Sequence, residues 1–162
     1  MKRKDFLNLN QGKTSACVAY TVSNIIYYLS KEVVSPIMIF KKAREFMDID
    51  NTKGLNFPAI NKLLGKYYDI VKLSKDLESL YITVMIEETP IAVSVNMQLI
   101  DPKAVSGRHA VIIYKIQGDV IYYVNSWGET WGPHNDNSGY FVYDKKHINW
   151  AFKIKLNSDK TK

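Results

Sequence analysis

Cysteine is nearly absent from this sequence: Cys17 is the only one in 162 residues. A single cysteine cannot close an internal disulfide, so the fold does not need an oxidising compartment and we expect the chain to work in the cytoplasm. No apolar run approaches the length of a transmembrane helix, which excludes a spanning segment and a membrane partner. The basic start at 1–4 is followed by no apolar segment, so we expect no signal peptide.

Two further kinds of site are missing. There is no glycine-rich loop that could cradle a phosphate and no cluster of His and Cys at metal-ligand spacing, so we expect no cofactor and no metal ion. The net charge of +6 is spread along the chain, without the basic run interleaved with aromatics that indicates nucleic-acid binding. We therefore interpret the charge as a solvated basic surface and expect no nucleic-acid partner.

The residues that are present suit one domain with a sizeable core, since 46% are hydrophobic and 23% charged. The first half has helical periodicity. Residues 16–29 contain no Gly or Pro, and Ala16, Tyr20, Asn24 and Tyr27 recur on one helix face. Further helices are expected at 36–47 with Ser35 as N-cap, and at 58–64 with Gly65 as the stop, while 67–73 predicts a short strand and 76–87 a helix or a loop.

In the second half the pattern changes to alternation. Stretches rich in Val, Ile and Tyr predict strands at 91–97, 110–116, 120–124, 140–143 and 151–156. Gln117-Gly118-Asp119 predicts a hairpin turn between two of them. The sequence therefore predicts an α+β fold in one domain, 1–162, made of two packed lobes: a mainly helical lobe over about 1–88 and an antiparallel β lobe over about 89–162.

Cys17 opens the helical run 16–29 and is a candidate nucleophile. With Thr14 or Ser15 as N-cap, the thiol would lie in the first helical turn. Free backbone N–H groups and the helix dipole place partial positive charge there, which favours the thiolate and a lowered pKa. A lone cysteine in a helix is more often a small buried hydrophobic residue, so the catalytic reading depends on partners elsewhere in the chain.

His109 and Asn125 supply those partners. His109 precedes the strand at 110–116 and Asn125 ends the strand at 120–124, so a tight turn at 117–119 brings both to the same end of a hairpin. A thiol can attack while an imidazole holds the proton and an amide oxygen fixes the imidazole tautomer. Taken alone, His109 reads as a structural histidine at the mouth of an apolar strand.

Four sequence blocks in order carry a resemblance to a known family. They are Asn10-Gln11-Gly12 with Ser15-Ala16-Cys17, the stretch 107–111, the block Asn125-Ser126-Trp127-Gly128-Glu129-Thr130-Trp131-Gly132, and Ser138-Gly139-Tyr140-Phe141. Together they strongly resemble the papain-like cysteine peptidases, over nearly the whole chain. The resemblance implies a papain-like fold with the active site in the cleft between the two lobes.

The resemblance also assigns roles. Cys17 matches the nucleophile, His109 the general base and acid, and Asn125 the residue that orients the imidazole. Trp127 matches the indole that shields this pair, and Gln11 the oxyanion donor that acts with the backbone N–H of Cys17. The resemblance places substrate-binding walls at Gly54, Ala110 and Ser94.

The sequence departs from the family pattern in several places. Thr14 stands where the family has a disulfide-bonded cysteine, and Val18 where it has Trp. Cys17 and His109 are 92 residues apart (109 − 17), against about 130 or more in the family, so we expect trimmed loops. Only Gly54 remains of a paired glycine in the substrate loop. Arg108 places a cation next to the imidazole, and no pro-region is recognised.

The leading hypothesis is a thiol hydrolase that cleaves peptide bonds in a peptide or protein substrate. An alternative enzyme is a transamidase or deamidase that forms the same thioester on a glutamine side chain of a protein. A non-catalytic binding module of the same fold is the third reading. A small, basic, disulfide-free domain of this kind would also suit a toxin or effector delivered into a target-cell cytosol, with a protein inhibitor or immunity-type partner in the producing cell.

Overall fold

The longer helices lie in the first half of the chain and five of the six strands in the second, in a computed structural model that describes residues 1–47, 55–104 and 107–157. The helices are α1 (Cys17–Ser30), α2 (Pro36–Arg44), α3 (Phe57–Leu64), α4 (Leu77–Tyr81) and α5 (Met97–Ile100), with the short turns η1 (Arg3–Asp5), η2 (Ile82–Ile86) and η3 (Lys145–His147). The strands are β1 (Tyr68–Lys72), β2 (Ile91–Asn96), β3 (Arg108–Gln117), β4 (Val120–Val124), β5 (Ser138–Val142) and β6 (Ile148–Leu156). The α+β class expected from the sequence is confirmed.

The strands form one six-stranded sheet in the order β1-β6-β2-β3-β4-β5, and the paired strands are antiparallel. The expected hairpin between β3 and β4 is confirmed, with Gly118 at φ 62° in its turn. β1 comes from the mainly helical half yet pairs with β6 at one edge of the sheet. Its partner, the last strand in the sequence, therefore lies inside the sheet, between β1 and β2.

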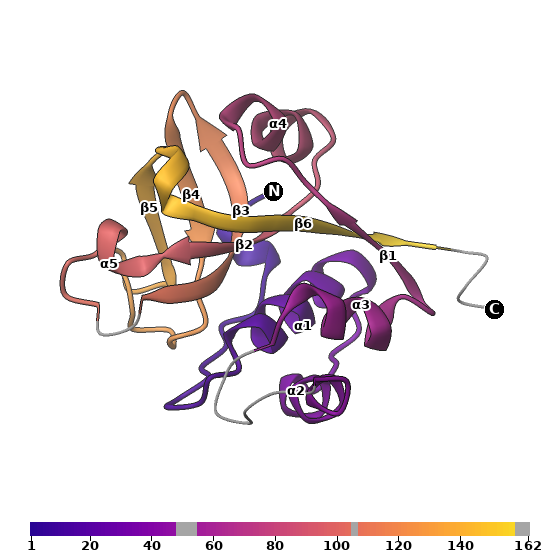
Figure 1. The fold of residues 1–162 in the computed structure, drawn as a ribbon. Helices are drawn as coiled ribbons and strands as arrows, with labels where there is room; N and C mark the ends of the chain where they lie inside the picture. Colours follow the sequence, from indigo (N-terminus) through magenta and orange to yellow (C-terminus); the bar gives the residue numbers. More distant parts are fainter. Residues whose placement is uncertain (48–54, 105–106, 158–162) are drawn as a thin grey trace.

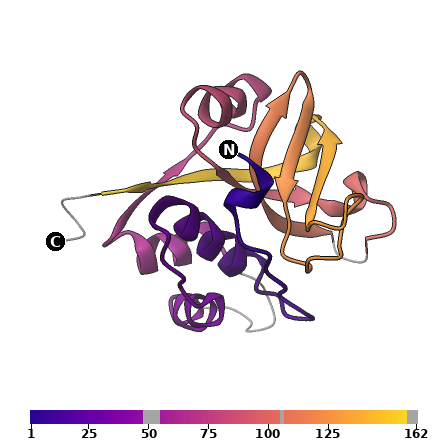
Figure 2. The same cartoon turned by 180° about the vertical axis from the view of Figure 1, so that it is seen from behind.

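Two apolar clusters cover the two faces of the sheet. On one face α1, α2 and α3 pack through buried residues that include Ile25, Ile26 and Ile60 against Phe152 of β6. On the other face Leu80 and Val84 pack against the opposite side chains of β2, β3 and β4. Figures 1 and 2 show α1, α2 and α3 on one side of the sheet and α4 on the other. Covered on both faces, β2 is apolar almost without alternation.

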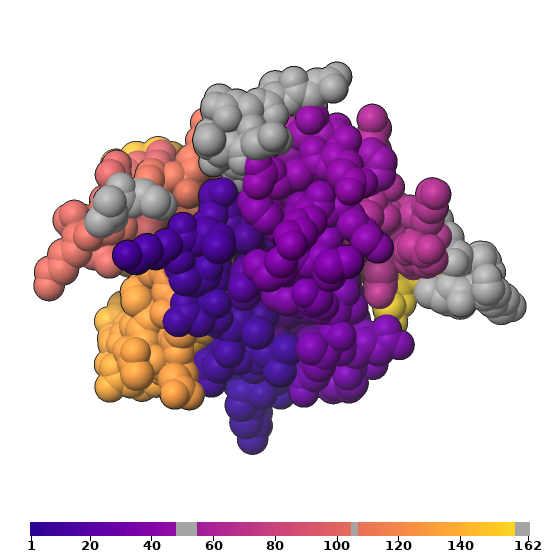
Figure 3. All heavy atoms as spheres, turned by 90° about the horizontal axis from the view of Figure 1, so that it is seen from below, coloured from indigo at the N-terminus to yellow at the C-terminus, as the bar shows by residue number. Residues whose placement is uncertain are grey.

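The N-terminal segment, residues 1–16, connects the helices to the sheet. Phe6 is buried, stacks on Tyr28 of α1 at 4.9 Å between ring centroids, and lies 6.3 Å from the ring of Tyr114 on β3. Figure 3 shows this segment in indigo between the purple helices and the orange strands. Arg3 Nε also donates to the carbonyl of Asp136, in the loop that precedes β5.

The helix ends differ from the expected ones in detail. The N-cap of α1 is Ala16, without a side-chain cap, so the prediction of Thr14 or Ser15 is wrong; the Thr14 hydroxyl instead donates to the Gln11 carbonyl. Ser35 caps α2 as expected, accepting from the Met38 N–H. The region 76–87 is helical, beginning at its N-cap Asp76 and passing from α4 into the π-helical turn η2.

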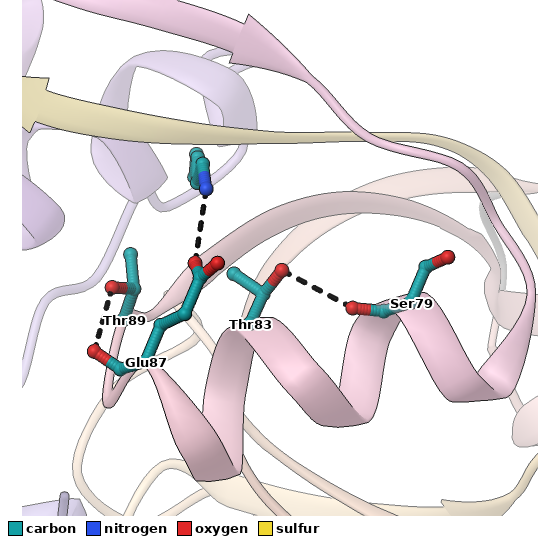
Figure 4. Close-up of polar contacts among 5 residues, drawn as sticks. Ser79, Thr83, Glu87 and Thr89 are labelled. Carbon is teal, nitrogen blue, oxygen red and sulfur yellow. Dashed lines mark hydrogen bonds and ion pairs between the residues drawn. The ribbon is translucent and has the colours of Figure 1, made fainter.

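A buried lysine fastens this π-helical turn to the sheet. Lys153 of β6, mostly buried, pairs with Glu87 directly after η2 at 3.0 Å between Nζ and Oε2. In Figure 4 a dashed line ends on the Glu87 carboxylate and marks this ion pair, and two further lines mark the hydroxyl bonds from Thr83 to the Ser79 carbonyl and from Thr89 to the Glu87 carbonyl. Nowhere in the part of the chain that the structure describes is a helix long and apolar enough to cross a bilayer.

Candidate active site

Cys17 is the first residue of α1, and its side chain is half-buried. The chain turns into the helix through Gly12, whose φ of 61° is in the left-handed region. Tyr20 N–H donates to the Ala16 carbonyl and so starts the helical bonding at this cap. This arrangement leaves the backbone N–H groups of the first turn without intrahelical partners, beside the thiol.

His109 lies near the start of β3, opposite Val95 of β2, and is 3% exposed. Its Nε2 is 2.5 Å from Oδ1 of Asn125, which follows β4. The same Oδ1 accepts the backbone N–H of Ser126 at 2.8 Å, so the amide oxygen faces the imidazole. An amide oxygen only accepts, and therefore Nε2 carries the proton and Nδ1 is the basic nitrogen.

Trp127 covers this pair. Its ring stacks on that of His109 with centroids 4.3 Å apart and planes 28° from parallel. Trp131 meets Trp127 edge-on at 5.3 Å and supports it from behind. Trp127 thus covers a face of the His109 ring, at the position where the sequence-based expectation places a shielding indole.

Gln11 is buried beside the same loop. Its Oε1 accepts from the Ser126 hydroxyl at 2.6 Å, and its Nε2 donates to the Thr14 carbonyl at 2.9 Å. Its backbone N–H donates to the Ser126 carbonyl at 2.8 Å. With the oxygen held by Ser126, one N–H of the side-chain amide is left to donate to an oxyanion.

One cleft, with a volume of about 1020 Å³, brings these residues together. Gln11, Cys17, His109 and Trp127 line it, and Asn125 lies behind His109. Ala110 and Ser94, expected as substrate walls, line the same cleft and are paired across β3 and β2. Gly54, the third expected wall, lies outside the described residues.

The cleft has walls that the sequence did not single out. They are the side chains of Trp150, Leu55, Asn56, Lys13 and Val18. Trp150 stands opposite Ser94 in the β2–β6 register and stacks on Phe152 at 5.3 Å. No local motif marks Trp150, and only the pairing of β6 with β2, more than 50 residues earlier, brings it to the site. Ser126 is part of the Asn125–Gly132 block, but its contact with Gln11 depends on a fold that motif spacing does not reveal.

Burial sets the charge states of the two reacting groups. It raises the pKa of the Cys17 thiol, while backbone hydrogen bonding at Ala110, Val18 and Cys17 acts in the opposite direction and is the smaller effect. The lowered thiol pKa expected from the helix N-terminus is therefore wrong, because the thiol is less solvated than an ordinary first-turn side chain.

Burial also lowers the pKa of His109 to about 4, against the opposing effect of its bond to Asn125. Near neutral pH both groups are thus uncharged, with the proton on sulfur and Nδ1 of His109 free to accept it. Arg108, which lines the cleft with an exposed side chain, is not among the causes of the shift in the His109 pKa. Within the described ranges, no group of three or more His, Cys, Asp or Glu side chains could hold a metal ion.

Comparison with known proteins finds likeness in structure but not in sequence. No family model matches the chain, and no curated protein matches it. A structure solved to explain the limited antibody cross reactivity between the mite allergens Blo t 1 and Der p 1 superposes with a TM-score of 0.66 at 15% identity, covering 95% of this chain and 69% of that one.

Procathepsin L 3 of the Tenebrio molitor larval midgut also gives 0.66, at 13% identity, over 91% of this chain and 66% of its own. The Carica candamarcensis cysteine protease CMS1MS2, solved in complex with E-64, gives 0.56 at 12% identity, over 93% and 92%. At such identities the likeness speaks for the fold alone, and the conclusion it supports is that this chain has the papain-like fold.

Proposed function

We propose that the protein is a thiol hydrolase that cleaves peptide bonds through a thioester on Cys17. The observation that carries the proposal is the bond from His109 Nε2 to Asn125 Oδ1, covered by Trp127 and placed in one cleft with Cys17 and Gln11. Each part has a defined task in acyl transfer, and a binding surface would need none of them in this arrangement.

In the acylation step Nδ1 of His109 takes the proton from the Cys17 thiol as sulfur attacks the carbonyl carbon of the peptide. The carbonyl oxygen becomes an oxyanion that accepts from Gln11 Nε2 and the Cys17 backbone N–H. The imidazolium then gives its proton to the leaving amine, the C–N bond breaks, and a thioester remains.

In the deacylation step His109 takes a proton from water while the water oxygen attacks the thioester. Collapse of the second tetrahedral intermediate breaks the C–S bond and releases the carboxylic acid. The proton on the imidazolium returns to the sulfur, and the site regains its neutral pair. Burial disfavours a thiolate or an imidazolium that forms alone. When the proton moves from Cys17 to His109, the two charges form together and stabilise each other.

The test is labelling of Cys17 by an epoxide thiol-protease inhibitor such as E-64, measured across pH in the wild type and in His109→Ala. If His109 serves as base and acid, its removal slows labelling by about 10²–10⁴-fold. Equal rates in the two proteins, following an ordinary thiol pKa of about 8.5, would mean that no thiol–imidazole pair operates, as in a binding module.

The reaction class is separated by mass spectrometry of a protein mixture treated with the wild type or with Cys17→Ala. New chain termini that depend on Cys17 support a peptidase. Mass shifts of about one unit on intact chains, which arise when water resolves a glutamine thioester, would instead identify a deamidase, and amine adducts a transamidase.

We further propose a reducing setting for the enzyme, such as the cytosol of a producing or a target cell, because the catalytic thiol must stay reduced to act. As a toxin or effector it would harm a host cell in a Cys17-dependent way and would need a protein inhibitor in the cell that makes it. Expression of the wild type and of Cys17→Ala in a host cytosol tests this point, and equal growth of the two cultures would refute the toxin role.

A further inference from the structure

We propose that Asn137 is a positioning residue for the reacting groups of the cleft; this inference rests on the proposed function. Asn137 directly precedes β5, in the loop after Trp131, and its side chain is 0% exposed. Its hydrogen bonds within the described structure go to neither Cys17 nor His109. Its four polar groups, two in the backbone and two in the side chain, all bond to segments that carry site residues.

Two of the bonds hold the residues around the imidazole. The Asn137 carbonyl accepts the backbone N–H of Asn125 at 2.7 Å. The Asn137 side-chain oxygen accepts the backbone N–H of Trp127 at 3.0 Å. Asn137 thus fixes two backbone positions. Its carbonyl holds Asn125, which bonds Nε2 of His109, and its side chain holds Trp127, which stacks on the ring.

The other two bonds close the loop and reach the N-terminal segment. The Asn137 N–H donates to the Trp131 carbonyl at 2.9 Å, and its Nδ2 donates to the Leu9 carbonyl at 2.9 Å. Leu9 lies two residues before Gln11. Asn137 therefore ties the segment with the oxyanion donor to the loop with Asn125 and Trp127, and it holds the two halves of the site in register.

The backbone at Asn137 suits this use. Its φ of 62° is in the left-handed region, which asparagine tolerates better than most residues. Because the side chain donates on one side and accepts on the other, an amide satisfies both partners at once. A hydroxyl or a carboxylate of similar size cannot donate to Leu9 and accept from Trp127 with the same geometry.

Asn24 offers a matched control. It is also a buried asparagine, and its side chain bonds the N-terminal segment through both the N–H and the carbonyl of Leu7. It lies on α1 and has no recorded bond to the loop 125–137. Loss of either side chain removes two hydrogen bonds: Asn24 loses both of its bonds to Leu7, whereas Asn137 loses one to Leu9 and one to Trp127.

The experiment compares Asn137→Gly with Asn24→Ala. Glycine keeps the left-handed backbone and deletes only the side-chain bonds. Two quantities are measured in each folded variant: the rate of Cys17 labelling by E-64, and the titration midpoint of the His109 ring by NMR. A signal missing in His109→Ala assigns the ring. The other charged or titratable side chains on this cleft, among the described residues, are Lys13, Cys17 and Arg108.

We expect Asn137→Gly to slow labelling at least about tenfold, because a small displacement of reacting groups is costly. We also expect its His109 midpoint to move upward, toward 6.5, as Trp127 loosens and water reaches the ring. Asn24→Ala loosens the N-terminal segment but not the loop 125–137, so it should slow labelling less than Asn137→Gly and leave the His109 midpoint within a few tenths of a pH unit, whatever it does to stability. Unchanged labelling and an unchanged midpoint in Asn137→Gly would overturn the inference.

A second variant separates the two side-chain bonds of Asn137. Asn137→Asp keeps the acceptor for Trp127 and the tolerance for the left-handed backbone but loses the donor to Leu9. It should label more slowly than the wild type and faster than Asn137→Gly, and equality with the wild type in rate and midpoint would count against Asn137. The NMR midpoint needs no catalysis, so it still judges the inference if the wild type and His109→Ala label equally and the proposed function fails.

Discussion

His109 keeps a neutral ring because the residues around it exclude water. It is 3% exposed, its Nε2 bonds an amide that is itself buried, and its face is covered by Trp127. The Asn125 side chain carries the one buried polar atom without a partner in the described structure, its Nδ2. Because these surroundings are desolvated in the folded chain, protonation of His109 affects the stability of the fold as well as the proposed catalysis.

The first prediction concerns stability against pH. The pKa of His109 is about 4 in the folded chain and about 6.5 when unfolded. As pH falls through this window the unfolded chain binds a proton that the folded chain refuses, so the free energy of unfolding falls with pH by about 3 kcal/mol in all. Chemical denaturation at pH 7, 5.5 and 4 should show this extra loss in the wild type and not in His109→Gln.

The exposed His134 provides the control for that series. His134→Gln should keep the full acid-dependent loss of the wild type. Equal slopes in the wild type and His109→Gln would mean that the imidazole is as easily protonated in the folded chain as in water.

A second residue-scale prediction concerns Gln11. Because Ser126 engages the Gln11 oxygen, the direction of the side-chain N–H is fixed, and in the proposed mechanism this N–H donates to the substrate oxyanion. Gln11→Ala should lower kcat by about 10²–10³, as loss of one oxyanion donor does, with little change in KM. Ser126→Ala should lower kcat less, since the amide remains but is less well held. An exposed glutamine at the β3–β4 turn, replaced in Gln117→Ala, serves as control.

Among the elements, the loop between β4 and β5 carries more of the site than any helix or strand. Asn125, Ser126, Trp127 and Asn137 all belong to it. Gly132 lies in this loop with φ of 96°, and the Ser138 carbonyl oxygen is only 2.1 Å from where a Cβ would stand. The backbone at Gly132 thus passes close to the backbone at Ser138, and this close approach lets the loop fold back toward the imidazole.

We therefore predict that Gly132→Ala lowers the free energy of unfolding by more than about 2 kcal/mol, through both the strained φ and the collision. Gly107→Ala is the matched change, since nothing lies within 4 Å of its added Cβ, and it should stay within about 0.5 kcal/mol of the wild type. Denaturant titration of the three proteins measures this. Similar midpoints for both variants would show that the loop is free to rearrange.

The elements also show how far sequence patterns reach. Alternation located β2, β3, β4 and the turn at Gly118, because these strands are apolar and locally paired. It placed the start of β6 at 151 instead of Ile148, since Ile148–Trp150 are strand only through pairing with Val95 and Ser94 of β2. Trp150 was missed as a cleft wall for the same reason.

The expected charge state of Cys17 failed for a related reason. Position at a helix N-terminus is visible in the sequence, whereas desolvation by the cleft walls depends on residues from the far half of the chain. The grouping of Gln11, Cys17, His109 and Trp127 in one cleft followed the ordered motifs. The roles of Ser126 and Asn137 did not, because hydrogen bonds between distant loops leave no periodic trace.

At the scale of the whole molecule, the N-terminal segment joins the helices to the sheet. Phe6 is its apolar anchor, inserted between Tyr28 of α1 and Tyr114 of β3. Beyond Phe6 the segment bonds the loop 125–137 at several backbone positions, including Gly128 N–H to the Leu9 carbonyl at 3.1 Å. The site is therefore assembled across the junction, and its geometry depends on how firmly this segment is seated.

Phe6→Ala should lower the free energy of unfolding by about 3–5 kcal/mol, the usual cost of deleting a buried phenyl ring. In the molecules that remain folded it should also slow Cys17 labelling, because the segment that carries Gln11 loses its anchor. The exposed ring of Tyr140 on β5 gives the comparison, and Tyr140→Ala should change both quantities little. If Phe6→Ala is destabilised but Cys17 is labelled at the wild-type rate, Phe6 stabilises the fold without positioning the site.

The place of β6 in the sheet has a consequence for synthesis of the protein. Cys17 leaves the ribosome 108 residues before Asn125 (125 − 17), which is about 5–20 s at ordinary elongation rates of about 5–20 residues per second. β6 is made after the other five described strands, yet it must enter between β1 and β2 before the sheet and the Trp150 wall are complete. Until β6 emerges, the nascent chain thus carries the Cys17 thiol without a complete cleft, and the proposed hydrolase stays inert toward the translation machinery during that interval.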